Sequence, residues 1–195
     1  DLSERALLFA VADRLLDRAQ GSEAVAYWNA LARRGLAPGA WSVEAPVINS
    51  EFRTAPAGGG LDWRVAAAAG VEIRAVPECG ELAITLDGHQ PESADVVAER
   101  VVVPAGARYR AAIESRTEGL RRESGLEWQV RHRKGVVLAS VPVQATEEWA
   151  RSGGVIPAAP EDRVLEMVLT YRRLAGTVRA EGVARFRRAW MERSH

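Results

Sequence analysis

The chain has 195 residues, enough to bury one substantial hydrophobic core with a small appended element. Its 47% hydrophobic and 27% charged residues are typical of a globular protein, and 26 basic residues balance 26 acidic ones, so no net field favours nucleic acid or an anionic membrane. The single cysteine, Cys79, excludes an internal disulfide and a cysteine-based metal cluster. No apolar run reaches the ~20 residues that cross a bilayer, and no signal peptide precedes Asp1, so we expect a fragment or a processed form.

Residues 1–36 predict a helical hairpin. The break between its helices is Gln-Gly-Ser at 20–22, with Ser22 as the expected N-cap, and the second helix ends in Arg-Arg-Gly at 33–35. Helix, turn and helix of this length match one tetratricopeptide unit or an ordinary helical hairpin, which packs either on the later part of the chain or on earlier repeats. The apolar positions at helical spacing are Leu8, Val11, Ala12, Leu15 and Ala19 in the first helix, and Ala24, Trp28, Leu31 and Ala32 in the second.

A linker rich in proline and glycine, residues 37–44, separates the hairpin from a domain that spans residues 45–195. In this domain the apolar period changes to two, and short runs alternate with turn signals such as Asp87-Gly88. Short strands without intervening helical patterns predict an antiparallel two-sheet sandwich, so the fold class is mainly β. The expected strands are 45–52, 61–65, 70–76, 80–88, 96–103, 107–115, 125–133, 136–141, a short run after Trp149, 163–173 and 176–190.

The phase of these strands predicts which side chains are buried. The large residues expected in the core are Phe52, Trp63, Tyr109 and Trp128. Polar residues occupy the opposite phase of two strands, namely Arg110 and Glu114 on one, and Glu127, Gln129 and Arg131 on the other. The alanine- and glycine-rich stretch 55–60 is expected to form a loose surface loop, because it lacks the lysine and the following helix of a phosphate-binding loop.

The order of several landmarks resembles the galactose-binding-like jelly rolls that include many carbohydrate-binding modules. These landmarks are Asn49-x-x-Phe52, Trp63, the strand ending in Asp87-Gly88, "VVVPAGARYRAAI" at 101–113, "GLEWQV" at 125–130, Trp149 and "GVARF" at 182–186. More narrowly, residues 45–190 look like the sandwich found after tetratricopeptide repeats in some bacterial envelope and exopolysaccharide-associated proteins. The resemblance implies a jelly-roll fold, an oligo- or polysaccharide ligand, a protein partner for the helical region, and a location in the bacterial cell envelope or periplasm.

The chain departs from this family at the residues that hold a structural calcium ion. Many such modules begin Asn-Gly-x-Phe-Glu and close with a strand that contains Asp. Here Ser50 and Arg53 stand at the Gly and Glu positions, and the closing strand "GVARFRRAW" contains no Asp. Calcium requires six to eight oxygen ligands and usually several carboxylates, so we expect no metal and no cofactor.

Motifs for catalysis are missing from the sequence. There is no Gly-x-Ser-x-Gly elbow and no His-Glu-x-x-His spacing for zinc. Glu114 and Glu127, on strands that are potential near neighbours, are the one carboxyl pair considered for glycoside hydrolysis, but exposed strand glutamates are common and we predict no catalytic residue. The basic residues near the C-terminus, Arg179, Arg185, Arg187 and Arg188, either bind phosphate groups or protect an edge strand, and the neutral overall charge favours the second reading.

The six tryptophans suggest a ligand, because exposed aromatic rings serve as stacking platforms for sugars. Trp41 and Trp149 are expected to be the more exposed, and Trp190 fits either environment. We predict a noncatalytic glycan-binding or assembly module of a bacterial envelope protein, with no nucleic-acid partner and no membrane insertion by this segment. The alternatives are a structural or protein-interaction domain without ligand and, less favoured, a glycoside-active enzyme. The predicted ligand-binding residues are Arg110, Glu114, Glu127, Gln129, Arg131 and Trp149.

Overall fold

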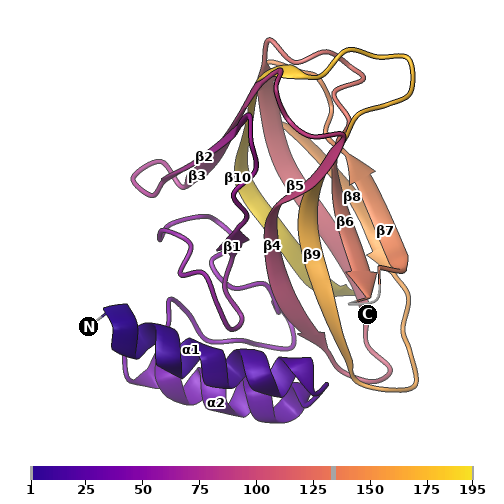
Figure 1. Ribbon diagram of the computed structural model, residues 1–195. Coiled ribbons are helices and arrows are strands. Elements are labelled where there is room, and N and C mark those ends of the chain that lie inside the picture. The colour runs from indigo at the N-terminus through magenta and orange to yellow at the C-terminus, as the bar shows by residue number, and fades with distance from the viewer. Residues whose placement is uncertain (1, 133–134, 195) are drawn as a thin grey trace.

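The computed structural model describes residues 2–132 and 135–194, which form two helices at one end of a two-layered β-sandwich (Figure 1). The helices are α1 (Leu2–Asp17) and α2 (Gly21–Arg33). The strands are β1 (Arg64–Val65), β2 (Val71–Val76), β3 (Glu81–Asp87), β4 (Ser93–Val103), β5 (Arg108–Glu118), β6 (Leu126–His132), β7 (Val137–Pro142), β8 (Ala150–Ile156), β9 (Arg163–Arg172) and β10 (Glu181–Ser194). The predicted fold class, a mainly β sandwich preceded by a helical hairpin, is confirmed.

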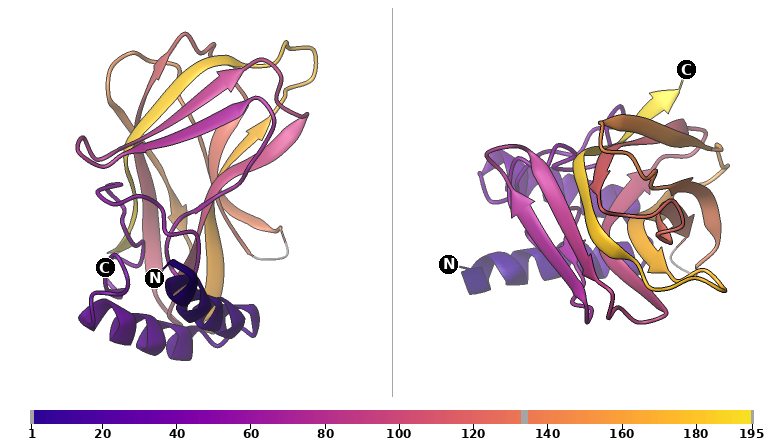
Figure 2. Two further views of the ribbon diagram at one scale, coloured as in Figure 1. Left: turned by 60° about the vertical axis from the view of Figure 1, so that its left-hand side comes forward. Right: turned by 90° about the horizontal axis from the view of Figure 1, so that it is seen from above.

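The strands form two antiparallel sheets of five strands each. The first sheet has the order β1-β4-β9-β6-β7 and the second has the order β2-β3-β10-β5-β8. Figure 2 shows the two layers and the helices at one end of them. The strand β10 lies between β3 and β5, so it is a central strand. The prediction that its arginines protect a sheet edge is therefore wrong.

The core between the sheets contains a row of touching aromatic rings. The ring centroids of Phe52 and Trp63 lie 5.5 Å apart, those of Trp63 and Trp128 lie 5.6 Å apart, and those of Trp128 and Phe186 lie 5.4 Å apart. Both contacts of Trp128 are edge-to-face, with interplanar angles of 73° and 87°. Tyr109 is also buried, and its hydroxyl donates to the carbonyl of Val43 at 2.6 Å. All four large residues expected in the core lie there. Period-two alternation turns Tyr109 on β5 and Trp128 on β6 inward, whereas Phe52 and Trp63 lie outside the strands.

The sandwich does not begin with the expected strand at 45–52. The backbone is left-handed at Asn49 (φ 50°) and Phe52 (φ 51°), which interrupts an extended conformation. Asn49 stabilises this turn, because its side-chain amide donates to the carbonyl of Thr54 at 2.8 Å and accepts from the Thr54 amide at 3.1 Å. The segment still lies beside β10, where the amide of Ala189 donates to the carbonyl of Ser50 at 2.8 Å.

The helical hairpin packs on the sandwich through a second hydrophobic cluster. On α2 the predicted stripe is observed, since Ala24, Trp28 and Leu31 are buried. On α1 the phase differs from the prediction, because the fully buried side chains include Phe9, whereas Val11 is 46% exposed. The cluster comprises Phe9, Ala12, Leu16, Ala24, Trp28, Leu31, Ile48, Leu61 and Val102. Because Val102 belongs to β4, the hairpin buries its apolar face on the sandwich that comes after it in the chain.

Two local predictions for this region are wrong. The N-cap of α2 is Gln20, whose side chain makes no capping bond, while Ser22 lies inside the helix and its hydroxyl donates to Asp162 at 3.2 Å. The stretch 55–60 is not a loose loop throughout, because Gly59 and Gly60 are buried against the helices. A Cβ at Gly60 would lie 2.2 Å from the Trp28 ring, so glycine permits the close approach.

Candidate functional site

The structure divides the predicted ligand-binding residues between opposite outer faces of the sandwich. Arg110 and Glu114 lie on β5 in the second sheet, whereas Glu127, Gln129 and Arg131 lie on β6 in the first sheet. Their neighbours on each strand point into the shared core, so the two polar rows point away from each other. The expectation that Glu114 and Glu127 are near neighbours is wrong, and these two carboxyls cannot act together on one glycosidic bond.

Glu127 and Gln129 of the polar row on β6 line a shallow hollow of about 360 Å³ on the outer face of the first sheet. Glu127 and Gln129 form one wall, and Asp95 of β4 and Thr170 of β9 lie across from them. The Gln129 side chain donates to one Glu127 oxygen, and the Ser140 hydroxyl donates to the other at 2.6 Å. These bonds fix the carboxylate of Glu127 in the wall of the hollow.

Two further hollows continue from this one. They are lined by the β5–β6 and β9–β10 loops, which lie at the end of the sandwich away from the helices (Figure 1). The second, of about 700 Å³, shares Glu127 and Arg172 with the first. The third, of about 820 Å³, lies between the β5–β6 and β9–β10 loops and shares Arg122, Glu123 and Ser124 with the second. Since neighbouring hollows share walls, we treat all three as one feature, the rim groove.

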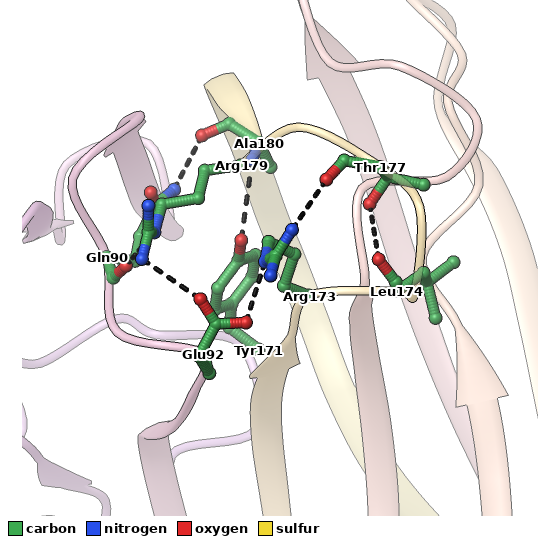
Figure 3. Close-up of polar contacts among 8 residues, drawn as sticks. All are labelled: Gln90, Glu92, Tyr171, Arg173, Leu174, Thr177, Arg179 and Ala180. Atoms are coloured by element: carbon green, nitrogen blue, oxygen red, sulfur yellow. Dashed lines mark hydrogen bonds and ion pairs between the residues drawn. The ribbon is translucent and has the colours of Figure 1, made fainter.

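The wall of the rim groove is held by a network of arginines around Glu92, shown in Figure 3. Arg173 donates to Glu92 at 2.7 Å and to the carbonyl of Thr177 at 2.9 Å. Arg179 donates to the other oxygen of Glu92 at 3.0 Å and to the carbonyl of Gln90 at 2.6 Å. The hydrogen bond from Arg173 lowers the pKa of Glu92 below its usual range. The network ties the β9–β10 loop to the start of β4, so the loop is fixed before a ligand arrives.

The rim groove is polar and electrically balanced. Its charged residues are the acids Glu92, Asp95, Glu123, Glu127 and Glu181 and the bases Arg121, Arg122, Arg172, Arg173 and Arg179. Apolar contact area is also available, because Leu174 is 43% exposed and Val178 is 66% exposed. None of the tryptophans lines the groove in the part of the chain that the structure describes. Such a surface suits a neutral, hydroxyl-rich ligand better than a charged one.

Arg131 differs in its contacts from Glu127 and Gln129, the other two polar residues of the row on β6. Its guanidinium donates to both Asp95 oxygens, at 3.2 and 2.6 Å, and to Glu166 at 3.1 Å. The hydrogen bond to Asp95 is the main cause that raises the pKa of Arg131. These contacts use three of the five N–H donors of the guanidinium and hold Asp95, which lines the hollow, whereas Arg131 itself does not line it.

The other predicted residues lie on the outer face of the second sheet. Arg110 is exposed, and Glu114 accepts a hydrogen bond from Arg187 at 2.7 Å. Trp149 is half-buried between the guanidiniums of Arg116 and Arg187, whose Cζ atoms lie 5.2 and 4.7 Å from its ring centroid. Two guanidiniums therefore lie against the Trp149 ring, on surface that a sugar would use for stacking. Trp149 is a half-buried ring in contact with arginines, not the more exposed ring that the sequence predicted.

Two carboxyl groups are fully buried near the contact between hairpin and sandwich. Burial raises the pKa of Asp62 to about 6, against hydrogen bonds from the backbone, including one from the amide of Ala57 at 2.7 Å. Burial, and next the charge of Asp62, raise the pKa of Glu99 well above its usual range. One Glu99 oxygen accepts from the amide of Ile48 at 2.6 Å, and the other has no partner among the described residues. Neither carboxyl reaches the rim groove.

Within residues 2–132 and 135–194, no group of three or more His, Cys, Asp or Glu side chains is placed to hold a metal ion. At the start of the sandwich, Arg53 lies 3.9 Å from Glu51 rather than beside a carboxylate cluster. The absence of calcium binding remains a prediction. Over the same residues, neither helix is long and apolar enough to span a bilayer.

Sequence reasoning missed most of the rim groove. Its residues come from the start of β4 and from the β5–β6 and β9–β10 loops, at 92–95, 119–125 and 172–182. Arg179 was assigned to a strand, but β10 begins only at Glu181. The segments "EGLRRESG" and "RRLAGTVRAEG" have the glycine-rich, charged composition of ordinary surface loops, so the sequence contains no distinct signal for the groove.

No protein-family model matches the chain, and neither does any curated protein sequence. Among solved structures, a CBM4 module has a TM-score of 0.54 at 13% identity, and the match covers 76% of this chain and 99% of that one. A CBM61 module in complex with β-1,4-galactotriose has a TM-score of 0.49 at 20% identity, covering 77% and 99%. A carbohydrate-binding module from Cellvibrio mixtus lichenase 5A, in complex with cellotriose, has a TM-score of 0.41 at 10% identity, covering 67% and 92%. The likeness to the CBM4 module supports the jelly-roll fold, and the two weaker likenesses add no argument of their own.

Proposed function

We propose that the chain is a noncatalytic glycan-binding module and that the rim groove holds a neutral oligo- or polysaccharide. The observation that carries the proposal is the continuity of the three hollows from the face of the first sheet, past Glu127 and Arg172, to the loops beyond Ser124. A path of this kind fits an extended polymer better than a compact metabolite, which usually binds in a single enclosed pocket. The jelly-roll likeness to a CBM4 module gives further support at the level of fold.

The groove chemistry agrees with a sugar ligand. Sugar hydroxyls both donate and accept, and the walls offer carboxylates, guanidiniums, an amide and hydroxyls in close succession. The exposed side chains of Leu174 and Val178 offer apolar contact for the C–H faces of the rings. Without an open aromatic platform, we expect modest affinity that depends on hydrogen bonds, each worth about 0.5–1.5 kcal/mol.

The test is binding of soluble neutral polysaccharides, including β-1,4-galactan and a β-1,4-glucan, by calorimetry and affinity electrophoresis. The double variant Glu127→Ala/Gln129→Ala removes two side chains where the first hollow is walled. We expect affinity to fall about 10- to 100-fold, which corresponds to the loss of about two hydrogen bonds. Glu72→Ala removes an exposed carboxylate on β2, in the other sheet, and should leave affinity unchanged.

Full-strength binding by the Glu127→Ala/Gln129→Ala protein would place the sugar elsewhere and refute the assignment of the groove. If the parent protein binds no neutral polysaccharide, a second candidate function is favoured. This candidate is a protein contact through the helical hairpin, and α1 favours it because Leu7 and Val11, one turn apart, are 70% and 46% exposed. An assembly role in a bacterial envelope, next to further helical repeats, belongs to this second candidate.

A further inference from the structure

The outer face of the second sheet carries two tryptophan rings that are each flanked by two guanidiniums. Arg116 and Arg187 flank Trp149, while the Cζ atoms of Arg151 and Arg188 lie 4.6 and 4.5 Å from the centroid of Trp190. Trp190 is only 5% exposed although it belongs to neither hydrophobic core. We call this feature the arginine–tryptophan stack, which consists of Arg116, Trp149, Arg187, Arg151, Trp190 and Arg188.

The strand register explains why the stack forms here. On the outer face, Trp190 of β10 pairs with Ala112 of β5, which in turn pairs with Gly153 of β8. These two small residues leave room beside the large indole. The next outward row pairs Glu114 with Arg188 on one side and Arg151 on the other, so guanidiniums from both neighbouring strands lie beside the Trp190 ring.

The hydrogen-bonding capacity of the stack is only partly used by the protein. Glu114 holds Arg187 at 2.7 Å, and Glu192 holds Arg151 at 3.3 Å. In contrast, the nearest carboxylate oxygens to Arg116 and Arg188 lie 3.9 Å away, on Glu118 and Glu51. Arg188 is 44% exposed and makes no side-chain hydrogen bond among the described residues. Its donors are therefore available to an anionic ligand.

Stacking on indole also prepares these guanidiniums for binding. A cation held over an aromatic face is attracted by the negative charge of the ring face, and the contact restricts the rotation of a long side chain. Because less rotamer freedom remains to be lost on binding, such an arginine contributes more affinity than a free one. The planar edge of each guanidinium then presents parallel N–H groups that match a carboxylate or a sulfate.

The part of this face formed by β5, β8 and β10 carries an excess of arginine, although the chain as a whole is neutral. The outward positions of β5, β8 and β10 carry seven arginines and four glutamates, which gives a net charge of +3. The arginines are Arg108, Arg110, Arg116, Arg151, Arg185, Arg187 and Arg188, and the glutamates are Glu114, Glu118, Glu181 and Glu192. Arg110 is exposed and has no partner among the described residues.

We propose that this face is a second binding surface, for an acidic polysaccharide whose carboxylate or sulfate groups meet Arg188, Arg110 and the other outward arginines. The rings disfavour single-stranded nucleic acid, because bases bind by stacking on open aromatic faces, whereas Trp190 is buried and Trp149 already contacts two guanidiniums. Arg110, Arg188 and the arginine–tryptophan stack line none of the hollows of the rim groove, so a test of this surface is independent of the function proposed for that groove.

The experiment measures binding of polygalacturonate by affinity electrophoresis and calorimetry, with β-1,4-galactan as the neutral probe and single-stranded DNA as a second polyanion. The variant Arg110→Gln/Arg188→Gln removes two charges from the face. The control Arg33→Gln/Arg34→Gln removes the same charge from exposed positions at the end of the hairpin. Melting curves of both variants show whether they fold. If the double variant does not fold, the single Arg110→Gln variant replaces it in the binding measurements.

We expect the parent protein to bind polygalacturonate, and its affinity to fall when salt is raised from about 50 to about 200 mM, because counterions are displaced. The Arg110→Gln/Arg188→Gln protein should bind it at least about tenfold more weakly, since two charge-assisted contacts are lost, while the control binds like the parent. Equal binding by the parent and the Arg110→Gln/Arg188→Gln variant would overturn the proposal. DNA binding as strong as polygalacturonate binding, with the same sensitivity to the variant, would overturn the assignment to a polysaccharide.

Discussion

Replacing Trp128 by Ala tests how the sandwich core is built, because this ring joins the two sheets. Trp128 on β6 is 2% exposed and touches Trp63 and Phe186, the latter on β10 of the other sheet. Burial of about 150–250 Å² of aromatic surface at about 25 cal/mol/Å² stabilises the fold by about 4–6 kcal/mol, and the edge-to-face pairs add to this. The indole N–H of Trp128 has no partner among the described residues, which offsets about 1–3 kcal/mol of that gain.

We therefore expect Trp128→Ala to lower the free energy of unfolding by about 4 kcal/mol, close to typical large-to-small core penalties. For a chain of this length, that loss lowers the melting temperature by about 8–16 °C. Urea unfolding followed by circular dichroism gives the free energy, and thermal melts give the temperature. Trp128→Phe keeps an aromatic ring and removes the unpartnered N–H, so it should cost about 1–2 kcal/mol. The reasoning fails if Trp128→Ala melts within a couple of degrees of the parent, or if Trp128→Phe is equally damaging.

The buried carboxyls predict that stability falls as pH rises. Because the folded-state pKa of Asp62 is about 6 against an ordinary 3.8, the folded state binds more protons between these values, and about 3 kcal/mol of stability is lost as pH rises through that window. The raised pKa of Glu99 acts in the same direction as pH rises above its ordinary value of 4.5. Glu99→Gln should flatten the decline of the urea midpoint with rising pH, and an unchanged slope would contradict the assignment. Gly60→Ala should lower the melting temperature more than Gly58→Ala, since both have positive φ but only Gly60 lies against Trp28; equal losses would mean that the hairpin does not pack against this loop.

For the outer-face residues, strand phase predicts which way a side chain points but not which other side chains share its surface. Period-two alternation is a local property of the backbone, so the inward phase of Trp128 and Tyr109 and the outward phase of Gln129 and Arg110 could be derived from sequence. The pairing of strands is not local. Although β5 and β6 follow one another in the chain, the β5–β6 connection at 119–125 crosses from the second sheet to the first, which separates the two polar rows that sequence reasoning had placed on one surface.

Local patterns along the chain are enough to predict the mainly β class, the inward phase of β5 and β6 and the helical hairpin, because periodicity and turn residues act over a few positions. Which side chains meet depends on how the whole chain is packed. The rim groove joins Asp95, Glu127 and Arg179 from distant parts of the chain, and the arginine–tryptophan stack brings Trp149 beside Arg187 across β5. These contacts depend on sheet order and register, which are set by packing of the whole core. The residues of such a binding surface therefore lie far apart in the sequence and form no local motif.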